Sequence, residues 1–363
     1  MEEFLDLKAI GFQEPFVIAG PCSAEAENQL LDVAHDLVNV PYVQMFRAGI
    51  WKPRTRPSNF EGVGVPGLAW LKRIKEETGL QIITEIAYPE HIESVLNIGI
   101  DAIWLGARTT TSPFAVEEIA QALQGVNIPV FVKNPINPDI SLWIGAFERL
   151  QRAGVRKLIG IHRGFSTLRK TPFRYDPSWE IVIELKRLFP KLPILCDPSH
   201  IAGNAALIPA ICQRAFDLEY NGLMIEVHQN PQCAWSDSNQ QITPKMLQEM
   251  LQNLVFRSAN PDIIAQNDLL GWRTMIDHID TQLLELLQQR LQFIRQVARY
   301  KRDNKITVLQ LRRWQEVLES RLKKAEELNI NVHFVQNVMQ IIHEHSLEIH
   351  QEEMIFEHID SSL

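Results

Sequence analysis

The chain has 363 residues, 45% of them hydrophobic and 22% charged, with 17 glycines and 20 prolines. This composition excludes a disordered or fibrous chain and leaves room for two globular domains. A net charge of -8 argues against nucleic acid or an anionic membrane as a partner. No leader pattern opens the sequence and no apolar run nears the ~20 residues of a membrane span, so we expect a cytoplasmic protein with its 4 cysteines reduced.

Residues 15–228 repeat one pattern, in which a short apolar run and a polar turn are followed by a stretch with apolar residues at helical spacing. Strands that alternate with helices pair in parallel, so eight such units predict a (β/α)8 barrel. A doubly wound open sheet remains the alternative, because periodicity does not show closure. The predicted strands are residues 15–20, 43–46, 81–87, 102–105, 129–132, 157–161, 193–196 and 222–227.

Chemically capable side chains follow the predicted strands. In a barrel, the C-terminal ends of all strands meet at one mouth, where active sites lie. Several cations and potential metal ligands therefore converge there. They are Cys22, Arg47 with Lys52, Glu85, Arg108, Lys133, His162 with Arg163, Asp197 with His200, and Glu226 with His228.

The stretch 47–55 follows the second predicted strand and contains Arg47, Lys52, Arg54 and Thr55. Cations crowded at a strand end repel one another unless they bind an anion, and arginine suits phosphate or carboxylate. A solvated basic loop is the alternative for this stretch alone. In an acidic protein, a local basic cluster predicts a site for small anionic ligands.

Four potential ligands lie near the predicted mouth, although more than two hundred residues separate the first from the last: Cys22, His200, Glu226 and Asp237. A thiolate, an imidazole and two carboxylates suit a divalent transition metal. We expect Mn²⁺ first, with Fe²⁺, Co²⁺ or Zn²⁺ as alternatives. Cys22 as a nucleophile or as a buried spectator are the competing interpretations.

The pattern changes after residue 241. Residues 244–256 predict the last barrel helix, 258–261 suggest a linker, and the tail predicts helices over about 266–302, 309–328 and 332–356. We therefore expect domains at 1–257 and 266–363, joined by a linker at 258–265. An apolar stripe from Ile276 to Val297 runs along the first tail helix, which is too long for a compact monomeric bundle and predicts a partner.

Helix geometry indicates which cations of the tail can bind the same ligand within one chain. Arg290 and Lys301 lie on one face about 16 Å apart, whereas Arg273 lies about 25 Å from Arg290 and roughly 100° around the helix. Arg273 therefore cannot share a small ligand with the other two in its own chain. If it acts, it acts in the site of a partner chain.

Six motifs resemble the family of 3-deoxy-D-arabino-heptulosonate 7-phosphate (DAHP) synthases in its short class. They are residues 18–23, 47–55, 106–108, 196–200, 225–228 and 236–237, and the resemblance covers about 10–257. It implies a metal-dependent (β/α)8 barrel that condenses phosphoenolpyruvate with erythrose 4-phosphate at the entry to aromatic biosynthesis.

The resemblance also implies roles for individual residues. For phosphoenolpyruvate, Arg108 and Arg163 would hold the phosphate beside Ala107, and Arg47, Lys52 and Lys133 would face the carboxylate. Arg54 and Thr55 would bind the erythrose phosphate. The metal ligands would be Cys22, His200, Glu226 and Asp237. Lys133, Glu85 and Asp197 are equal candidates for the group that manages the attacking water.

Two features of the sequence bear on which sugar phosphate the barrel uses. Arg56 stands where many relatives carry a small residue, and its role is open. The mechanistically related 3-deoxy-D-manno-octulosonate 8-phosphate synthases use arabinose 5-phosphate and show Lys-Ala-Asn-Arg-Ser where this chain shows Lys52-Pro-Arg54-Thr55. The stretch favours erythrose, with arabinose as the alternative.

Residues 270–280 and 283–290, with Lys301 and Arg313, resemble the all-helical chorismate mutases over about 266–356. The resemblance implies an intertwined homodimer that rearranges chorismate to prephenate. Arg290, Lys301, Arg313 and the crossing Arg273 would clamp chorismate, with Ser346 lining the site. A catalytically inactive dimerisation and ligand-sensing module is the alternative.

Three positions depart from the mutase pattern. Gln310 and Trp314 stand where Asp and Glu are common, and His350 stands where many members have Gln. His350 could donate to the ether oxygen of chorismate when it is protonated. The alternative is that His350 is a surface histidine and that Gln351 or another group does this work. Because the two enzymes are joined, we also expect prephenate or chorismate to slow the barrel reaction.

Overall fold

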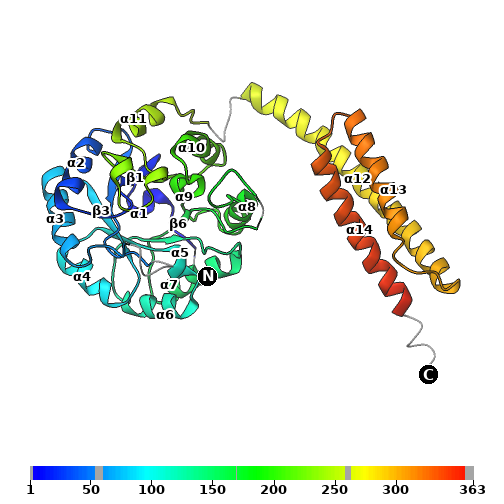
Figure 1. Cartoon of the computed structure of the whole chain (residues 1–363), viewed down its shortest axis with the longest axis horizontal. Coiled ribbons are helices and arrows are strands. Elements are labelled where there is room, and N and C mark those ends of the chain that lie inside the picture. The colour runs from blue at the N-terminus through cyan, green and yellow to red at the C-terminus, as the bar shows by residue number, and fades with distance from the viewer. Residues whose placement is uncertain (1–2, 54–59, 169, 258–262, 356–363) are drawn as a thin grey trace. The chain divides into compact units, whose positions relative to one another are not determined.

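The computed structural model of the chain describes residues 3–53, 60–168, 170–257 and 263–355. The chain forms two compact units, Met1–Ala259 and Asn260–Leu363 (Figure 1). The first unit is a closed barrel of parallel strands arranged in sequence order. The strands are β1 (Phe16–Gly20), β2 (Val43–Arg47), β3 (Gln81–Ile86), β4 (Ala102–Leu105), β5 (Val130–Lys133), β6 (Leu158–His162), β7 (Ile194–Cys196) and β8 (Gly222–Glu226). The barrel prediction is confirmed, and the open sheet is wrong.

Pairing of β1 with β8 closes the barrel. The register runs from Phe16 opposite Gly222 to Gly20 opposite Glu226. A β-carbon on Gly222 would lie 1.8 Å from the Phe16 carbonyl oxygen, so only glycine lets the two backbones meet. This contact brings the C-terminal end of the first strand beside the end of the last one.

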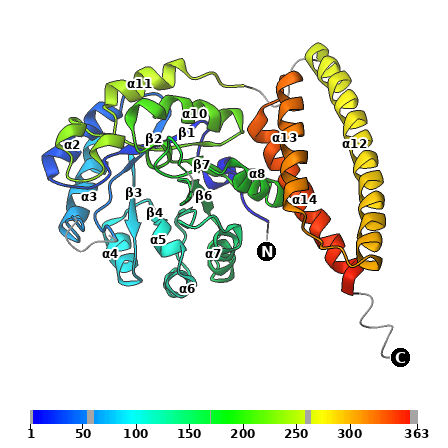
Figure 2. The same ribbon diagram turned by 45° about the vertical axis from the view of Figure 1, so that its right-hand side comes forward.

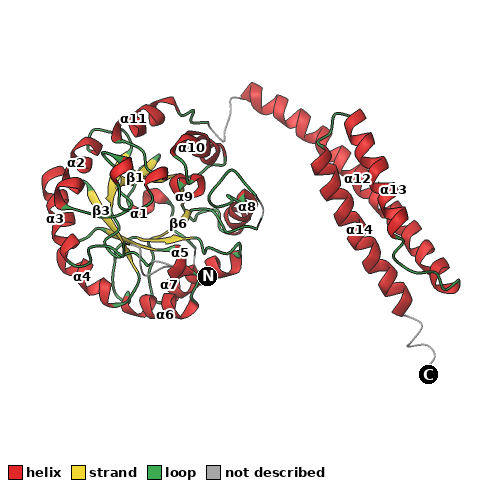
Figure 3. Ribbon diagram, in the orientation of Figure 1, coloured by secondary structure: helices red, strands yellow, loops and turns green. Residues whose placement is uncertain are grey.

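Helices surround the strands, as the colouring in Figure 3 shows. Side-chain caps start several of them, including the Asp139 carboxylate, which accepts from the backbone N–H groups of Ser141 and Leu142. The helices of this unit are α1 (Leu7–Ile10), α2 (Glu27–Leu37), α3 (Pro66–Thr78), α4 (Glu90–Ile98), α5 (Ala107–Thr110), α6 (Pro113–Ala122), α7 (Ile140–Arg152), α8 (Trp179–Leu188), α9 (Pro198–Ala202), α10 (Ile208–Asp217) and α11 (Pro244–Asn253).

Two apolar layers stabilise the barrel. One fills its interior, where Phe16, Trp104 and Phe131 are buried, and Phe12 stacks on Phe16 with ring centroids 4.3 Å apart. The other layer lies between strands and helices and takes the alternate strand residues, such as Val17. Because both faces of the strands are covered, most strand residues are apolar and do not alternate regularly with polar ones.

The second unit contains three described helices, α12 (Ile263–Asp303), α13 (Leu311–Glu327) and α14 (Val332–Ile355). The helix α14 packs against both α12 and α13 (Figure 2). The predicted stripe on α12 is largely uncovered in a single chain, since Ile276, Ile279, Leu283 and Leu286 are each more than half exposed. None of the described helices has the length and apolar content to cross a membrane.

Candidate functional site

A cleft lies at the C-terminal ends of the barrel strands. Side chains from the ends of β2, β3 and β5 and from segments that follow the other strands from β4 to β8 meet there, as the strand-end pattern predicts. The cleft is lined by Arg47, Lys52, Pro53, Glu85, Gly106, Ala107, Arg108, Lys133, Arg163, Arg174, Tyr175, His200 and Asp237. Arg54, Thr55 and Arg56 lie outside the described residues.

A cluster of potential metal ligands stands at one side of this cleft. Cys22, Glu226 and Asp237 each place a ligand atom within 4.8 Å of the other two. The Cys22 thiol donates to Asp237 Oδ2 at 3.2 Å. His200 is not part of this group of three, but its Nε2 lies 3.8 Å from Glu226 Oε1. The structure thus brings the four predicted ligands to one corner of the mouth.

The donor set fits a divalent transition metal. Burial and the neighbouring Glu226 raise the pKa of the Cys22 thiol to about 12, so the thiolate needs a nearby positive charge. A metal ion bound by sulfur, imidazole and carboxylates supplies such a charge and deprotonates the thiol.

Side-chain cations accompany the same ligand atoms. Lys52 Nζ lies 2.8 Å from Cys22 Sγ. Arg47 Nη2 donates to Glu226 Oε1 at 3.2 Å, and Arg174 Nη1 donates to Asp237 Oδ1 at 2.9 Å. The potential metal ligands and the cations of the cleft are therefore one connected cluster.

Asp197 joins two predicted functional residues. Its carboxylate accepts from Lys133 Nζ at 2.7 Å and lies 2.8 Å from His200 Nδ1. Burial raises the pKa of Asp197, but His200, Lys133 and Arg47 outweigh burial and hold that pKa well below its ordinary value. The bond to Asp197 occupies Nδ1 of His200 and leaves Nε2 for a ligand, the usual arrangement of a metal-binding histidine.

Arg47 is the residue that most directly indicates an anionic ligand. Its side chain is 1% exposed, and among the described residues its Nε and Nη1 atoms have no hydrogen-bond partner. Its guanidinium lies 5.0 Å from the centre of the Trp104 ring. A buried cation with unpaired donors is costly, and a bound carboxylate or phosphate would offset that cost.

Sequence reasoning missed Arg174, Tyr175 and Gln240. Arg174 also donates to Gln240 Oε1 at 2.6 Å, and Gln240 donates to Glu226 Oε2 at 2.7 Å. Arg174 and Tyr175 stand far beyond the end of β6, so a search of the residues next to strand ends passes over them. No periodic or spacing signal marks them.

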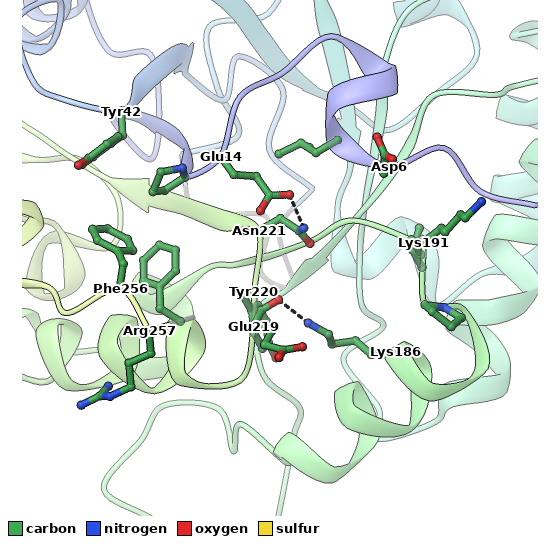
Figure 4. Close-up of a pocket in the computed structure, with 15 residues that line it drawn as sticks. Asp6, Glu14, Tyr42, Lys186, Lys191, Glu219, Tyr220, Asn221, Phe256 and Arg257 are labelled. Carbon is green, nitrogen blue, oxygen red and sulfur yellow. Dashed lines mark hydrogen bonds between the residues drawn. The ribbon is translucent and has the colours of Figure 1, made fainter. Parts of the chain in front are cut away.

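A larger cavity of about 730 Å³ lies at the other end of the barrel, where the strands begin (Figure 4). Several of its polar side chains are hydrogen-bonded to neighbouring groups. Asn221 donates to Glu14 at 2.7 Å, and Lys186 donates to the carbonyls of Leu218 and Glu219. Because it holds none of the predicted functional residues, this cavity is not the candidate active site.

The helical unit brings part of the second predicted site together. Arg290 Nη1 donates to Ser346 Oγ at 2.8 Å, and Lys301 Nζ donates to the Val308 carbonyl at 2.8 Å. Arg313 and Arg273 are exposed. Gln310 directly precedes α13, and Trp314 stacks on His343 with ring centroids 3.9 Å apart.

His350 is 5% exposed, so the interpretation as a surface histidine is wrong. Its Nδ1 lies 2.7 Å from the Ser346 carbonyl oxygen, and its Nε2 has no partner among the described residues. Since a carbonyl only accepts, Nδ1 carries a proton. In the neutral ring Nε2 is then an acceptor, and it becomes a donor only when the imidazole is protonated.

A closed parallel barrel whose mouth gathers cations and potential metal ligands, followed by a helical unit with a second cationic cluster, is the architecture of a two-domain enzyme for small anionic substrates. The sequence profile of the DAHP synthetase I family matches residues 6–257, so the chain belongs to that family. The profile of chorismate mutase type II matches residues 272–351. The chain therefore joins two enzyme domains.

Individual relatives support the barrel assignment. The phospho-2-dehydro-3-deoxyheptonate aldolase of Thermotoga maritima is 30% identical over 239 residues, covering 66% of this chain and 68% of the relative. This chain also superposes on a crystal structure of the DAHP synthase from Thermotoga maritima with a TM-score of 0.59 and 30% sequence identity. The match covers 65% of this chain and 67% of the chain in the crystal structure. The 2-dehydro-3-deoxyphosphooctonate aldolase of Delftia acidovorans is 26% identical over 281 residues, covering 70% of this chain and 93% of the relative. The family match and the higher identity favour DAHP synthase.

His162, at the end of β6, is fully buried against Trp179 and Tyr220. Its Nδ1 shares a hydrogen bond of 2.9 Å with the Tyr220 hydroxyl. Burial lowers the pKa of His162 to about 3 from an ordinary value of 6.5. Between pH 6.5 and about pH 3, His162 therefore binds a proton in the unfolded chain and stays neutral in the folded chain. The stability from neutral His162 is present above pH 6.5 and is lost as the pH falls toward 3.

We expect the free energy of unfolding of the barrel to fall by about 2 kcal/mol between pH 7 and pH 5 because of His162 alone. The His162→Gln variant keeps an acceptor for Tyr220 but has no proton to bind. Urea unfolding at both pH values measures the difference between wild type and variant. Equal pH dependence of the two proteins would contradict the expectation.

Proposed function

We propose that the barrel condenses phosphoenolpyruvate with erythrose 4-phosphate to give DAHP and phosphate, and that the helical domain rearranges chorismate to prephenate. The observation that carries the first activity is the buried Arg47, whose Nε and Nη1 atoms have no hydrogen-bond partner among the described residues, beside a cluster of thiol, imidazole and carboxylate groups. Two phosphorylated anions need several cations, and the mouth offers them.

The proposed roles follow the charges around the cleft. Arg108 and Arg163 bind the phosphate of phosphoenolpyruvate beside Ala107, and Arg47, Lys52 and Lys133 bind its carboxylate. Arg54 and Thr55 bind the phosphate of the sugar. The paired cations hold the enol so that its nucleophilic carbon faces the aldehyde. This orientation of the two substrates raises the rate of the condensation.

Cys22, His200, Glu226 and Asp237 would hold a divalent metal, with Mn²⁺ proposed first and Fe²⁺, Co²⁺ or Zn²⁺ as alternatives. Such an ion acts as a Lewis acid toward the aldehyde oxygen. Asp197 orients His200 for this role through the bond to Nδ1. The chain's own cations Lys52, Arg47 and Arg174 balance the negative charge of the ligand atoms.

In the proposed reaction the enol carbon forms a bond to the aldehyde carbon, water adds at the neighbouring carbon, and the phosphate leaves. Asp197 binds both Lys133 and His200, so its oxygens are engaged. Among the described residues, Glu85 shows no such pair of bonds. A β-carbon on Gly106 would lie 2.1 Å from Glu85 Oε1, so Gly106 makes room for this carboxylate beside the cleft. The contacts therefore favour Lys133 or Glu85 over Asp197 in the water step.

The barrel proposal is tested by comparing a variant of the proposed ligand Cys22 with a variant of a cysteine that lies away from the cleft. Phosphate release from phosphoenolpyruvate should require erythrose 4-phosphate, stop with a chelator and return with Mn²⁺. Cys22→Ala should lose Mn²⁺ binding in equilibrium dialysis and lose the condensation. Cys212→Ala removes a buried thiol in α10 away from the cleft and is the matched control. Faster turnover of arabinose 5-phosphate than of erythrose 4-phosphate would contradict the proposal.

The same assay tests the proposed coupling between the two enzymes. Prephenate or chorismate bound to the helical domain should slow the condensation, and the coupling is reciprocal in binding free energy. The full chain should therefore be inhibited, and a chain ending at Phe256 should not. Equal inhibition of both would show direct binding to the barrel and would overturn the proposed coupling.

The proposed mutase site uses Arg290, Lys301, Arg313 and Arg273 to hold the carboxylates and ether oxygen of chorismate. Ser346 lines the site and fixes Arg290, and Gln310 stands at its edge. The reaction is intramolecular, so the enzyme needs to hold the compact conformer and stabilise charge on the breaking ether. His350 Nε2 is the donor that we assign to that oxygen.

Mutase activity should depend on the charge of the His350 ring, because Nε2 donates only in the charged ring. The amide of His350→Gln donates at every pH, so this variant should lose the pH dependence. Chorismate absorbance measured from pH 8 to pH 5 compares the two proteins, with inactive Arg290→Ala as the background. Parallel profiles would refute the assignment.

We assign a homodimer through α12, because its stripe is exposed in one chain and Arg273 lies too far along the helix to reach its own site. Chains carrying Arg273→Ala or Arg290→Ala should each be inactive as mutases. Co-expressed, they should form mixed dimers with one intact site and recover part of the activity. Two inactive variants that stay inactive together would exclude the shared site.

The proposed domain bounds are 1–257 for the barrel and 266–363 for the mutase, with a linker at 258–265. The proposed substrates are phosphorylated sugars and acids of central metabolism, which supports a cytoplasmic location.

A further inference from the structure

The side chain of Tyr175 stacks on a cation of the mouth. The guanidinium carbon of Arg163 lies 3.4 Å from the centre of the Tyr175 ring, and that of Arg174 lies 5.6 Å from it. Burial raises the pKa of Tyr175, but Arg163, Arg174 and Arg108 lower it overall. Two arginines therefore lie over one aromatic side chain that sequence reasoning did not identify.

Backbone contacts fix the position of this ring independently of the arginines. Phe165 and Asp176 exchange backbone hydrogen bonds of 2.8 and 2.9 Å, and the Tyr175 N–H donates to the Ile201 carbonyl at 3.3 Å. Gly164 has φ +78°, and a β-carbon there would lie 2.9 Å from the β-carbon of Tyr175. The segment after β6 is thus folded back so that Tyr175 lies over Arg163.

The Tyr175 ring covers one face of the Arg163 guanidinium, and a backbone carbonyl binds one of its edges. Arg163 is 4% exposed, and its Nη1 donates to the Gly164 carbonyl at 3.3 Å. A guanidinium stacked on a ring keeps its N–H donors in the plane, where they can bind a phosphate with two parallel hydrogen bonds. The remaining edge of Arg163 is therefore oriented before any ligand arrives.

We propose that Tyr175 is a positioning residue that fixes the plane of the Arg163 guanidinium for the phosphate of phosphoenolpyruvate. The inference rests on the proposed condensation, in which Arg163 binds this phosphate. The ring does not touch the reacting atoms. It lowers the entropy that Arg163 loses when the phosphate binds, so its contribution is to affinity more than to turnover.

Substitutions that remove or keep the ring test this role. Tyr175→Leu and Tyr175→Met should raise the KM for phosphoenolpyruvate roughly tenfold. The value of kcat and the KM for the sugar phosphate should change less. Tyr175→Phe keeps the stack and should restore the KM to near the wild-type value. Tyr88→Leu, at an exposed tyrosine after β3, is the matched control.

Direct binding separates this inference from the proposed function. Titration of phosphoenolpyruvate and of inorganic phosphate, followed by calorimetry, measures affinity without turnover. Wild type that binds no phosphoenolpyruvate would overturn the proposed function. Wild type that binds it while the Leu and Met variants bind it equally well would overturn the role of Tyr175. So would a Phe variant as weak as Leu, or loss of the fold in both Leu and Met variants.

Discussion

The pairing of β1 with β8 is the contact on which the candidate site depends. Cys22 follows β1, and Glu226 ends β8, so the thiol meets the carboxylates only where the sheet closes on itself. Gly222 makes that closure possible because any β-carbon there would collide with the Phe16 carbonyl. A glycine with no chemistry of its own therefore determines the cluster that is proposed to bind the metal.

The mouth concentrates charge of both signs in a buried space. Each anionic ligand atom has a cation next to it, and Asp197 holds Lys133 and His200 together. Charges buried in this way are stable only as a network, since removal of one partner leaves another uncompensated. Aromatic rings also support two of these cations, since Arg47 lies over Trp104 and Arg163 lies over Tyr175.

In the helical domain, the candidate site forms partly within one chain, but the apolar surface of α12 is not covered there. Its catalytic candidates Arg290, Ser346 and His350 meet within one chain, but the apolar stripe of α12 stays exposed there. The sequence predicted the helices because apolar residues recur at helical spacing over long stretches. It left His350 undecided, because spacing does not reveal burial. The structure places this ring inside the unit, with its Nδ1 bonded to a carbonyl.

The sequence by itself determined the order of strands and helices, the strand-end residues from Cys22 to Asp237 and the second helical unit. These follow from local periodicity and from motifs of adjacent residues. Tertiary structure alone decided closure of the barrel, the pairing of Asp197 with both Lys133 and His200, and the stacking of Tyr175 on Arg163. Those contacts join residues far apart in the chain, and their geometry depends on backbone packing that no local pattern records.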